Sequence, residues 1–224
     1  ICLYSKLPFM KFKTLYFLGL TIVFFSCAQS KLATVTSQNS FLTTRGYEFE
    51  NDTVRITYNF WAKKGVMNFD VYNKLSVPIY IDLKTSAYIP NNKMLSYWQD
   101  ATNTEGSYIE SSYYFYGSRT TAGKLKSKSV RQERILIVSP HAQINNNVYN
   151  LVKNLADLPG KGAFNQYNSP LVFRNYLAIA MNEKFDGKIS YFDNSFYISE
   201  LRRVKSSQTE NFKSGGAFYI PISN

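Results

Sequence analysis

Residues 53–82 read TVRITYNFWAKKGVMNFDVYNKLSVPIYID and contain three short segments in which apolar and polar side chains alternate. Alternation with a period of two places the apolar side chains on one face of an extended strand. The segments are separated by Lys63-Lys64-Gly65 and Asn73-Lys74-Leu75-Ser76, which are short enough to be turns. The stretch therefore predicts an antiparallel meander, and the rest of the chain must supply a second layer that covers its apolar face. The predicted inward positions are Val54, Ile56, Tyr58, Phe60, Met67, Phe69, Val71, Val77, Ile79 and Ile81.

Further segments rich in β-branched and aromatic residues follow along the chain. Aromatic residues make up 17% of the sequence, and they favour strands. Counting these segments gives roughly nine or ten strands, with a turn signal about every ten residues, as is typical of an antiparallel sandwich. Beyond the opening stretch, the predicted strands cover residues 85–89, 94–98, 108–116, 134–138, 171–181, 189–192, 196–198 and 217–220.

Local features predict where some of these strands lie. Residues 134–138 read RILIV, a continuous apolar run that is typical of a central strand buried on both faces. Pro78 has no backbone N–H, so the third segment of the opening stretch is expected at a sheet edge or at a bulge. Asp186-Gly187 and Asp193-Asn194-Ser195 predict two tight hairpins, and residues 217–220 predict a closing edge strand.

One segment has the periodicity of a helix instead. Residues 146–158 carry an apolar stripe at helical spacing and are followed by Pro159-Gly160, a typical helix stop. The members of the stripe are Val148, Leu151, Val152, Leu155 and Leu158. The predicted fold class is therefore all-β: a single antiparallel β-sandwich domain over residues 46–224, with one short accessory helix across an open end.

The amino-terminal residues have the order of a secretory signal peptide. Lys11 and Lys13 precede an apolar run of 11 residues, 15–25, which is shorter than the roughly 20 residues of a membrane-spanning helix. The Phe25-Ser26-Cys27 ending resembles the lipobox of bacterial lipoproteins, with an aromatic residue in place of the usual aliphatic one. In that family the cysteine is acylated and becomes the first residue of the mature protein.

The residue order and the resemblance together predict three segments ahead of the domain. Residues 1–26 are expected to be a signal peptide, of which 1–9 lie upstream of a start at Met10. Cys27 is expected to carry the lipid, and residues 27–45, rich in Ser and Thr, to form a flexible tether. The alternative is an ordinary secreted protein in which Cys27 merely lies near the cleavage site.

The chain is strongly basic, with a formal net charge of +11. Three of its 26 Lys and Arg residues precede Cys27, which leaves 23 against 15 Asp and Glu residues, or +8. Such a surface attracts anionic polymers and lipid headgroups over a long range, although it also occurs on proteins without such a ligand. Nucleic acid is not an expected partner of an exported protein.

The residues that usually carry chemistry are few. The single histidine, His141, follows Pro140 and is expected in a turn at the surface, and no nucleophile motif accompanies it. One histidine and no mature thiol do not fit the familiar zinc patterns, so no metal site and no cofactor are predicted. The carboxylates Asp100, Glu105 and Glu110 lie in one region, but sequence proximity does not establish the paired geometry of a glycosidase. We therefore expect a protein that is not an enzyme.

Two sets of residues are candidates for binding. The first is a basic loop suited to phosphates or anionic glycans, for which the alternative is a solvated loop: Arg119, Lys124, Lys126, Lys128 and Arg131, with Arg134 beside them. The second is an aromatic platform for sugar rings, for which the alternative is that the rings belong to the core: Trp61, Tyr97 and Trp98, with Tyr113 and Tyr114.

Residues 69–82 also resemble the strand–turn–strand unit of immunoglobulin-like domains in envelope proteins, in which an Asn precedes the turn and a Pro opens the next strand. Here these residues are Asn73 and Pro78. With the lipobox, the chain resembles uncharacterised bacterial lipoproteins that carry one such domain. The resemblance implies a lipid-anchored protein on the periplasmic side of a membrane or at the cell surface, which binds or scaffolds another envelope component. The alternative is a module that binds carbohydrate or an anionic ligand such as lipopolysaccharide.

Overall fold

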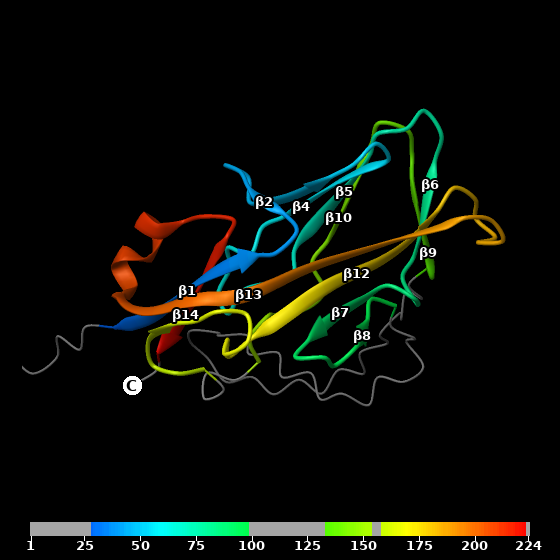
Figure 1. Ribbon diagram of the computed structural model, residues 1–224. Coiled ribbons are helices and arrows are strands. Elements are labelled where there is room, and N and C mark those ends of the chain that lie inside the picture. The colour runs from blue at the N-terminus through cyan, green and yellow to red at the C-terminus, as the bar shows by residue number, and fades with distance from the viewer. Residues whose placement is uncertain (1–27, 99–132, 154–157, 223–224) are drawn as a thin grey trace, which may run out of the picture.

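The computed structural model describes residues 28–98, 133–153 and 158–222, and in them the chain forms two antiparallel sheets that pack against each other (Figure 1). The larger sheet has nine strands, with the main order β14-β1-β13-β12-β6-β9. Short strands extend it, since β11 pairs with β13, β7 with β12, and β8 with β7. The bounds are β1 Gln29–Ser37, β6 Ile79–Asp82, β7 Ala87–Pro90, β8 Leu95–Ser96, β9 Ile135–Val138, β11 Gly162–Ala163, β12 Val172–Ala180, β13 Ile189–Lys205 and β14 Ala217–Ile222.

The smaller sheet has five strands in the order β10-β5-β4-β3-β2. Their bounds are β2 Phe41–Leu42, β3 Tyr47–Glu50, β4 Val54–Tyr58, β5 Phe69–Asn73 and β10 Gln143–Asn146. All pairings between the named strands are antiparallel, so the predicted all-β sandwich is confirmed. The helical element of the described chain is a 3₁₀ helix, η3, at Ser206–Phe212, in a segment for which the sequence predicted only a polar tail.

The predicted meander of residues 53–82 is only partly correct. The first two segments form β4 and β5, which pair with each other, but the third forms β6 in the opposite sheet. The side chain of Asn73 explains the change of sheet, because its Oδ1 accepts from the Leu75 N–H at 2.9 Å and its Nδ2 donates to the Val77 carbonyl at 2.8 Å. These bonds fix a turn that directs the chain across the sandwich. Val77, predicted to face inward, is 51% exposed on this turn.

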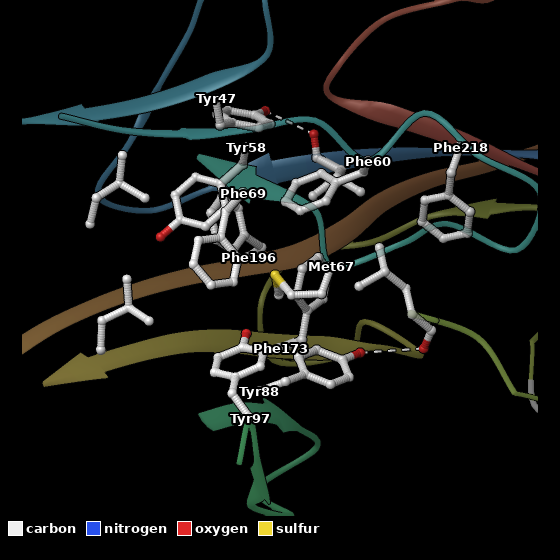
Figure 2. Close-up of a cluster of buried hydrophobic side chains, with 14 of the residues drawn as sticks. Tyr47, Tyr58, Phe60, Met67, Phe69, Tyr88, Tyr97, Phe173, Phe196 and Phe218 are labelled. Carbon is white, nitrogen blue, oxygen red and sulfur yellow. Dashed lines mark hydrogen bonds between the residues drawn. The ribbon is translucent and has the colours of Figure 1, made fainter. Parts of the chain in front are cut away.

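The apolar positions of the strands form one core between the sheets, as the alternation predicted. Val54, Ile56, Tyr58 and Phe60 are fully buried, and so are Met67 and Val71. Rings from both sheets meet in this core (Figure 2): Phe60 contacts Phe173 and Phe196 edge to face, with centroids 5.4 and 5.1 Å apart. Packing of this kind holds the two sheets together through dispersion and burial of apolar area.

A buried polar cluster also joins the two sheets. The hydroxyl of Tyr58, on β4, accepts from the side-chain amides of Asn194 at 2.7 Å and Asn175 at 3.0 Å, on β13 and β12. Asn175 in turn accepts from the hydroxyl of Tyr97 at 2.8 Å. All four side chains are buried, and buried polar groups are stable only when they are bonded in this way.

The predicted tether is wrong, because most of residues 27–45 belong to the fold. Strand β1 lies between β13 and β14 and hydrogen-bonds to both (Figure 1). Leu32, Ala33 and Val35 are buried on it. The polar composition of the segment was misleading because Thr is β-branched and suits a strand as well as a loop.

The predicted helix over residues 146–158 is also wrong for the part of this segment that is described, 146–153 and 158. The chain runs extended beside residues 64–67, where the Leu151 and Val152 N–H groups donate to the carbonyls of Gly65 and Lys64. Leu151, Val152 and Leu158 are buried as the stripe required, but Val148 is exposed. Leu151 and Val152 therefore reach the core from a segment that pairs with residues 64–67 rather than from a helix.

Three strand predictions need correction. Strand β9 lies at the edge of the larger sheet rather than at its centre, and Ile137 is 55% exposed. Strand β6, which Pro78 was expected to place at an edge or a bulge, pairs with both β12 and β9, because the proline precedes its first residue. Residues 193–195 do not turn, since β13 continues through them and Asn194 is held by Tyr58.

Of two other predictions, the tight hairpin at Asp186-Gly187 is correct only in part and the closing edge strand is confirmed. The chain turns back between β12 and β13, but Ala180 is paired with Ile189, so the loop spans residues 181–188 and Asp186-Gly187 is not a two-residue turn. Strand β14 forms one edge of the larger sheet.

Candidate functional site

Polar side chains form two rows across the outer face of the smaller sheet. The strand register sets Glu50, Arg55, Tyr72 and Gln143 side by side on four neighbouring strands. It does the same for Glu48, Thr57, Asp70 and Asn145. Because side chains alternate along a strand, these residues point away from the core that their neighbours fill. The outer face of this sheet is thus an ordered array of amides, charges and one aromatic ring.

Five residues of this array contribute to the lining of a groove of about 300 Å³, which we call the sheet groove. Its lining residues are Arg45, Arg55, Thr57, Asn59, Asn68, Asp70, Tyr72 and Gln143. A hollow of about 220 Å³ continues it, shares Asn59 and Asn68 with it, and is also lined by Trp61, Ala62, Val66 and Asn147. We call the two adjoining hollows together the extended groove. An aromatic side chain lies in each of its parts, Tyr72 in the sheet groove and Trp61 in the adjoining hollow.

Contacts within the sheet groove hold its polar groups in place. The amide of Asn145 donates to Asn68 at 2.8 Å and to Asp70 at 2.9 Å. The guanidinium of Arg55 lies over the ring of Tyr72, 4.8 Å from its centroid. Arg55 lines the groove, and in the described part of the chain no carboxylate lies within ion-pair distance of it.

The border of the sheet groove is held by two ion pairs. Arg45 contacts Glu48 at 2.9 Å, and Lys74 contacts Glu50 at 2.7 Å. The hydrogen bond from Lys74 lowers the pKa of Glu50 most, and the nearby charges of Arg55 and Arg45 lower it further. Each carboxylate at the border thus has an ion-pair partner, and neither forms an ion pair with Arg55.

The groove combines two chemical properties that suit a ligand rich in hydroxyl groups. Amide, guanidinium and carboxylate groups supply both donors and acceptors, which a hydroxyl can match in either sense. Aromatic rings supply flat apolar faces with polar edges. Asp70 is the one carboxylate that lines the groove among the described residues, so the paired acids of a glycosidase are not assembled there.

The predicted aromatic platform is separated by the fold. Trp61 is half-buried at the extended groove and its ring lies 5.4 Å from that of Tyr219. Trp98 is half-buried beyond β8 of the other sheet, with the Lys84 ammonium 5.6 Å from its ring centroid. The prediction is wrong for Tyr97, which is fully buried between the sheets because its ring and its hydroxyl both find partners in the core. Tyr113 and Tyr114 lie outside the described residues.

Most of the predicted anionic site also lies outside the described residues: Arg119, Lys124, Lys126, Lys128 and Arg131. Arg134 is described, and it forms an ion pair with Asp82 at 2.7 Å, so its charge is committed to the fold. Cys27, the predicted lipidation site, and the acids Asp100, Glu105 and Glu110 are outside the described residues as well.

His141 lies exposed in the turn between β9 and β10, with a backbone φ of 55°, as the sequence predicted. Within residues 28–98, 133–153 and 158–222, no three His, Cys, Asp or Glu side chains gather as metal ligands do. The described part of the chain also contains no helix with the length and hydropathy of a membrane span.

A separate hollow, of about 390 Å³, lies between β7, β8 and the segment 150–153. Its walls include Tyr88, Leu95, Leu151 and Leu158.

Sequence reasoning identified the outward side of β4 and β5 but did not identify it as a site. Arg55, Asp70 and Tyr72 are the polar members of the alternating stretch, and only the register with β10 brings Gln143 and Asn145 beside them. The sequence did contain one indication of a site. The outer face of β4 and β5 carries Arg, Asp and Tyr, which are side chains that commonly bind ligands, although a solvated face needs only to be polar.

Comparison of the chain with protein-family models, with curated proteins and with solved structures finds no match. The site must therefore be interpreted from its own residues.

Proposed function

We propose that this protein is a lipid-anchored, non-catalytic protein of the bacterial cell envelope, and that its sheet groove binds carbohydrate. The observation that carries the proposal is the set of polar side chains that line the groove, with Arg55 stacked on Tyr72 and Asn145 bonded to Asp70. Sugar hydroxyls can replace water at these donors and acceptors, and sugar C–H faces can pack on the rings.

The length of the extended groove favours an oligosaccharide over a single sugar. The two adjoining hollows run from Tyr72 to Trp61 through the shared residues Asn59 and Asn68. A ligand that spans both hollows contacts two aromatic side chains and the amides between them. Arg55, which has no ion-pair partner in the described chain, further favours sugars that carry a carboxylate or sulfate group.

The binding proposal is tested with an array of neutral and acidic oligosaccharides. The full chain is expected to bind a defined subset of these sugars, and Tyr72→Ala is expected to lose that binding. Tyr167→Ala is the matched control, because Tyr167 is 92% exposed and lies outside the groove. Equal loss in both variants, or binding that Tyr72→Ala leaves intact, rejects the groove as the site.

The proposed lipid anchor rests on the lipobox-like sequence that ends at Cys27. Cells that express the chain and receive a labelled fatty acid should incorporate the label into the protein, and Cys27→Ala should abolish incorporation. Label that persists in Cys27→Ala, or its absence from the unaltered chain, would reject acylation of this residue.

A protein scaffold is the second candidate, and the edge strand β9 favours it. Among the described residues β9 pairs with β6 alone, which leaves one backbone edge free beside the exposed side chain of Ile137. Such an edge can accept a strand from a partner protein. In-cell cross-linking should then capture one dominant envelope protein, and Ile137→Lys should abolish the capture; capture of the same protein by Ile137→Lys contradicts this candidate.

A further inference from the structure

The fold begins immediately after the proposed lipid-carrying residue. The carbonyl of Ala28 accepts a hydrogen bond from the Ser206 N–H at 2.9 Å, and Gln29 is paired with Lys205 on β13 and with Ile222 on β14. Consecutive Cα atoms lie about 3.8 Å apart, so a lipid on Cys27 is separated from the ordered sheet by about one residue. The chain therefore provides no spacer between a lipid at Cys27 and the domain.

Cations gather at this end of the larger sheet. Arg202, Arg203 and Lys205, which we call the basic end, are all exposed and are the last charged residues of β13. They are paired with Leu32, Lys31 and Gln29, the first residues of β1. Figure 1 shows this end of β13 next to the start of β1 and to η3, far from the loop between β12 and β13.

The charges of the basic end have no ion-pair partner among the described residues. In the described chain no carboxylate lies within ion-pair distance of Arg202, Arg203 or Lys205, although Glu200 and Glu210 belong to the same region. The guanidinium of Arg202 lies 4.3 Å from the ring centroid of Phe212, which holds it in place without cancelling its charge.

Lys31 adds a further positive charge behind this surface. Its ammonium is buried and donates to the Leu158 carbonyl at 2.8 Å. Burial lowers the pKa of Lys31 most, and the charge of Arg203 lowers it further, as expected for two cations held close together.

We infer that the basic end docks on anionic lipid headgroups, so that the domain lies directly on the membrane surface instead of extending from it. The inference rests on the acylation of Cys27 in the proposed function. A lipid anchor one residue away raises the effective concentration of headgroups at these side chains, and Lys and Arg near an anionic leaflet are attracted to it. The anchor and the basic end thus act as two membrane signals at one end of the larger sheet.

The test uses the full chain as cells produce it, reconstituted in vesicles of phosphatidylcholine with or without phosphatidylglycerol. A fluorescent probe is attached at Ser207→Cys, an exposed position beside the basic end, or at Met181→Cys, which is exposed at the far end of β12. Vesicles carry a headgroup quencher. Quenching at residue 207 is expected to be about twofold or more stronger on anionic than on neutral vesicles, and to disappear at high salt. Quenching at residue 181 should stay low on both.

Charge variants separate docking at the basic end from general attraction of a basic protein. Arg202→Ser, Arg203→Ser and Lys205→Ser, combined in one chain, should remove the extra quenching at residue 207. Lys93→Ser, Lys184→Ser and Lys188→Ser remove the same number of exposed charges elsewhere and should leave it unchanged. Quenching at residue 207 that equals that at residue 181, or that both triple variants lower equally, overturns the inference.

The mass of the amino-terminal peptide distinguishes failure of the inference from failure of the proposed anchor. An acylated Cys27 together with an unquenched probe at residue 207 rejects docking and keeps the anchor. A Cys27 without an acyl group rejects the anchor, and the docking inference falls with it. The chain without an added cysteine gives the background of dye attachment.

Discussion

The side-chain amide of Asn194 donates a hydrogen bond of 2.7 Å to the hydroxyl of Tyr58, which joins β13, the longest of the described strands, to the opposite sheet. Both residues are buried, and Asn175 donates to the same hydroxyl. Burial raises the pKa of Tyr58 well above its usual value, so the phenol stays neutral and the amides have a permanent acceptor. The sandwich therefore has a polar connection inside its apolar core.

Replacement of Tyr58 by Phe should destabilise the protein although the ring remains. The amides of Asn175 and Asn194 would lose their shared acceptor, and an unsatisfied buried polar group costs about 1–3 kcal/mol. Urea unfolding measures the change in the free energy of unfolding. Tyr167→Phe removes an exposed hydroxyl and serves as the control, with no expected change. Equal stability of Tyr58→Phe and the unaltered protein would show that the cluster contributes nothing.

The ion pair of Asp82 and Arg134 should make stability depend on pH in the acid range. Burial raises the pKa of Asp82, but hydrogen bonds from Arg134, Thr85 and the Lys84 N–H outweigh burial and lower it from 3.8 to about 2. A carboxyl whose folded pKa is lowered stabilises the fold above its unfolded pKa, and this contribution is lost as the pH falls from about 4 to about 2. Arg134→Leu should therefore lower the free energy of unfolding by about 1–2 kcal/mol at neutral pH and hardly change it near pH 2.

Arg174→Leu is the matched control for that prediction. Arg174 and Asp193 form an ion pair of 2.6 Å in which both side chains are more than one third exposed. Exposed pairs contribute about 0–1 kcal/mol, so little change is expected at any pH. Urea unfolding of both variants across the acid range gives the comparison. If Arg134→Leu lowers the free energy of unfolding by the same amount at neutral pH and near pH 2, the account of Asp82 is contradicted.

Gly65 should not tolerate a side chain. Its φ is +65°, and a Cβ there would lie 2.8 Å from the Phe218 ring and 2.9 Å from Leu151. The left-handed conformation alone costs a non-glycine residue about 1–2 kcal/mol, and the contacts with buried side chains add to it. Gly65→Ala should thus lower the midpoint of thermal unfolding, whereas Gly160→Ala, with 3.4 Å to the nearest atom, should not. A normal midpoint for Gly65→Ala would mean that the segment 150–153 does not pack as described.

The strands could be predicted where apolar and polar residues alternate. They were harder to predict where pairing with distant strands determines the structure of a segment. The period of β4, β5 and β12 is visible in the sequence because one face of each strand is buried. Strand β1 was missed because Ser and Thr fill many of its positions, although it is buried between two partners. The stripe of residues 148–158 suits a helix by its spacing, but pairing with residues 64–67 satisfies the backbone of the segment instead.

The sheet groove was less predictable than the fold. Arg55 and Tyr72 are separated by Gly65 and the turns around it, and they meet because β4 and β5 pair in one particular register. Asn145 comes from a strand more than seventy residues further along the chain and reaches Asp70 by the same means. Tyr97 was predicted to lie at the surface, and it precedes a polar stretch of the sequence, but it is buried in the core.

The bond from Asn145 to Asp70 and Asn68 should be required for the shape of the groove. Asn145 is exposed and lies on an edge strand, so Asn145→Ala should leave the unfolding free energy within about 0.5 kcal/mol of the unaltered value. Affinity for the oligosaccharides that the array identifies should nevertheless fall about tenfold, the equivalent of about 1.4 kcal/mol, since two acceptors lose their orientation. Asn150→Ala, at an exposed position outside both parts of the groove, should bind as the unaltered chain does. Unchanged affinity in Asn145→Ala would exclude these contacts from binding.

The most direct test of the proposed carbohydrate site uses the tryptophans, of which the chain has 2. Trp98→Phe leaves Trp61, at the extended groove, as the sole tryptophan, and Trp61→Phe leaves Trp98 on the other sheet. Titration with an oligosaccharide identified on the array should change the emission of the Trp98→Phe protein in a saturable manner, and the addition of Tyr72→Ala should remove the change. A response confined to the Trp61→Phe protein, or one that Tyr72→Ala leaves intact, would place the sugar elsewhere and contradict the account.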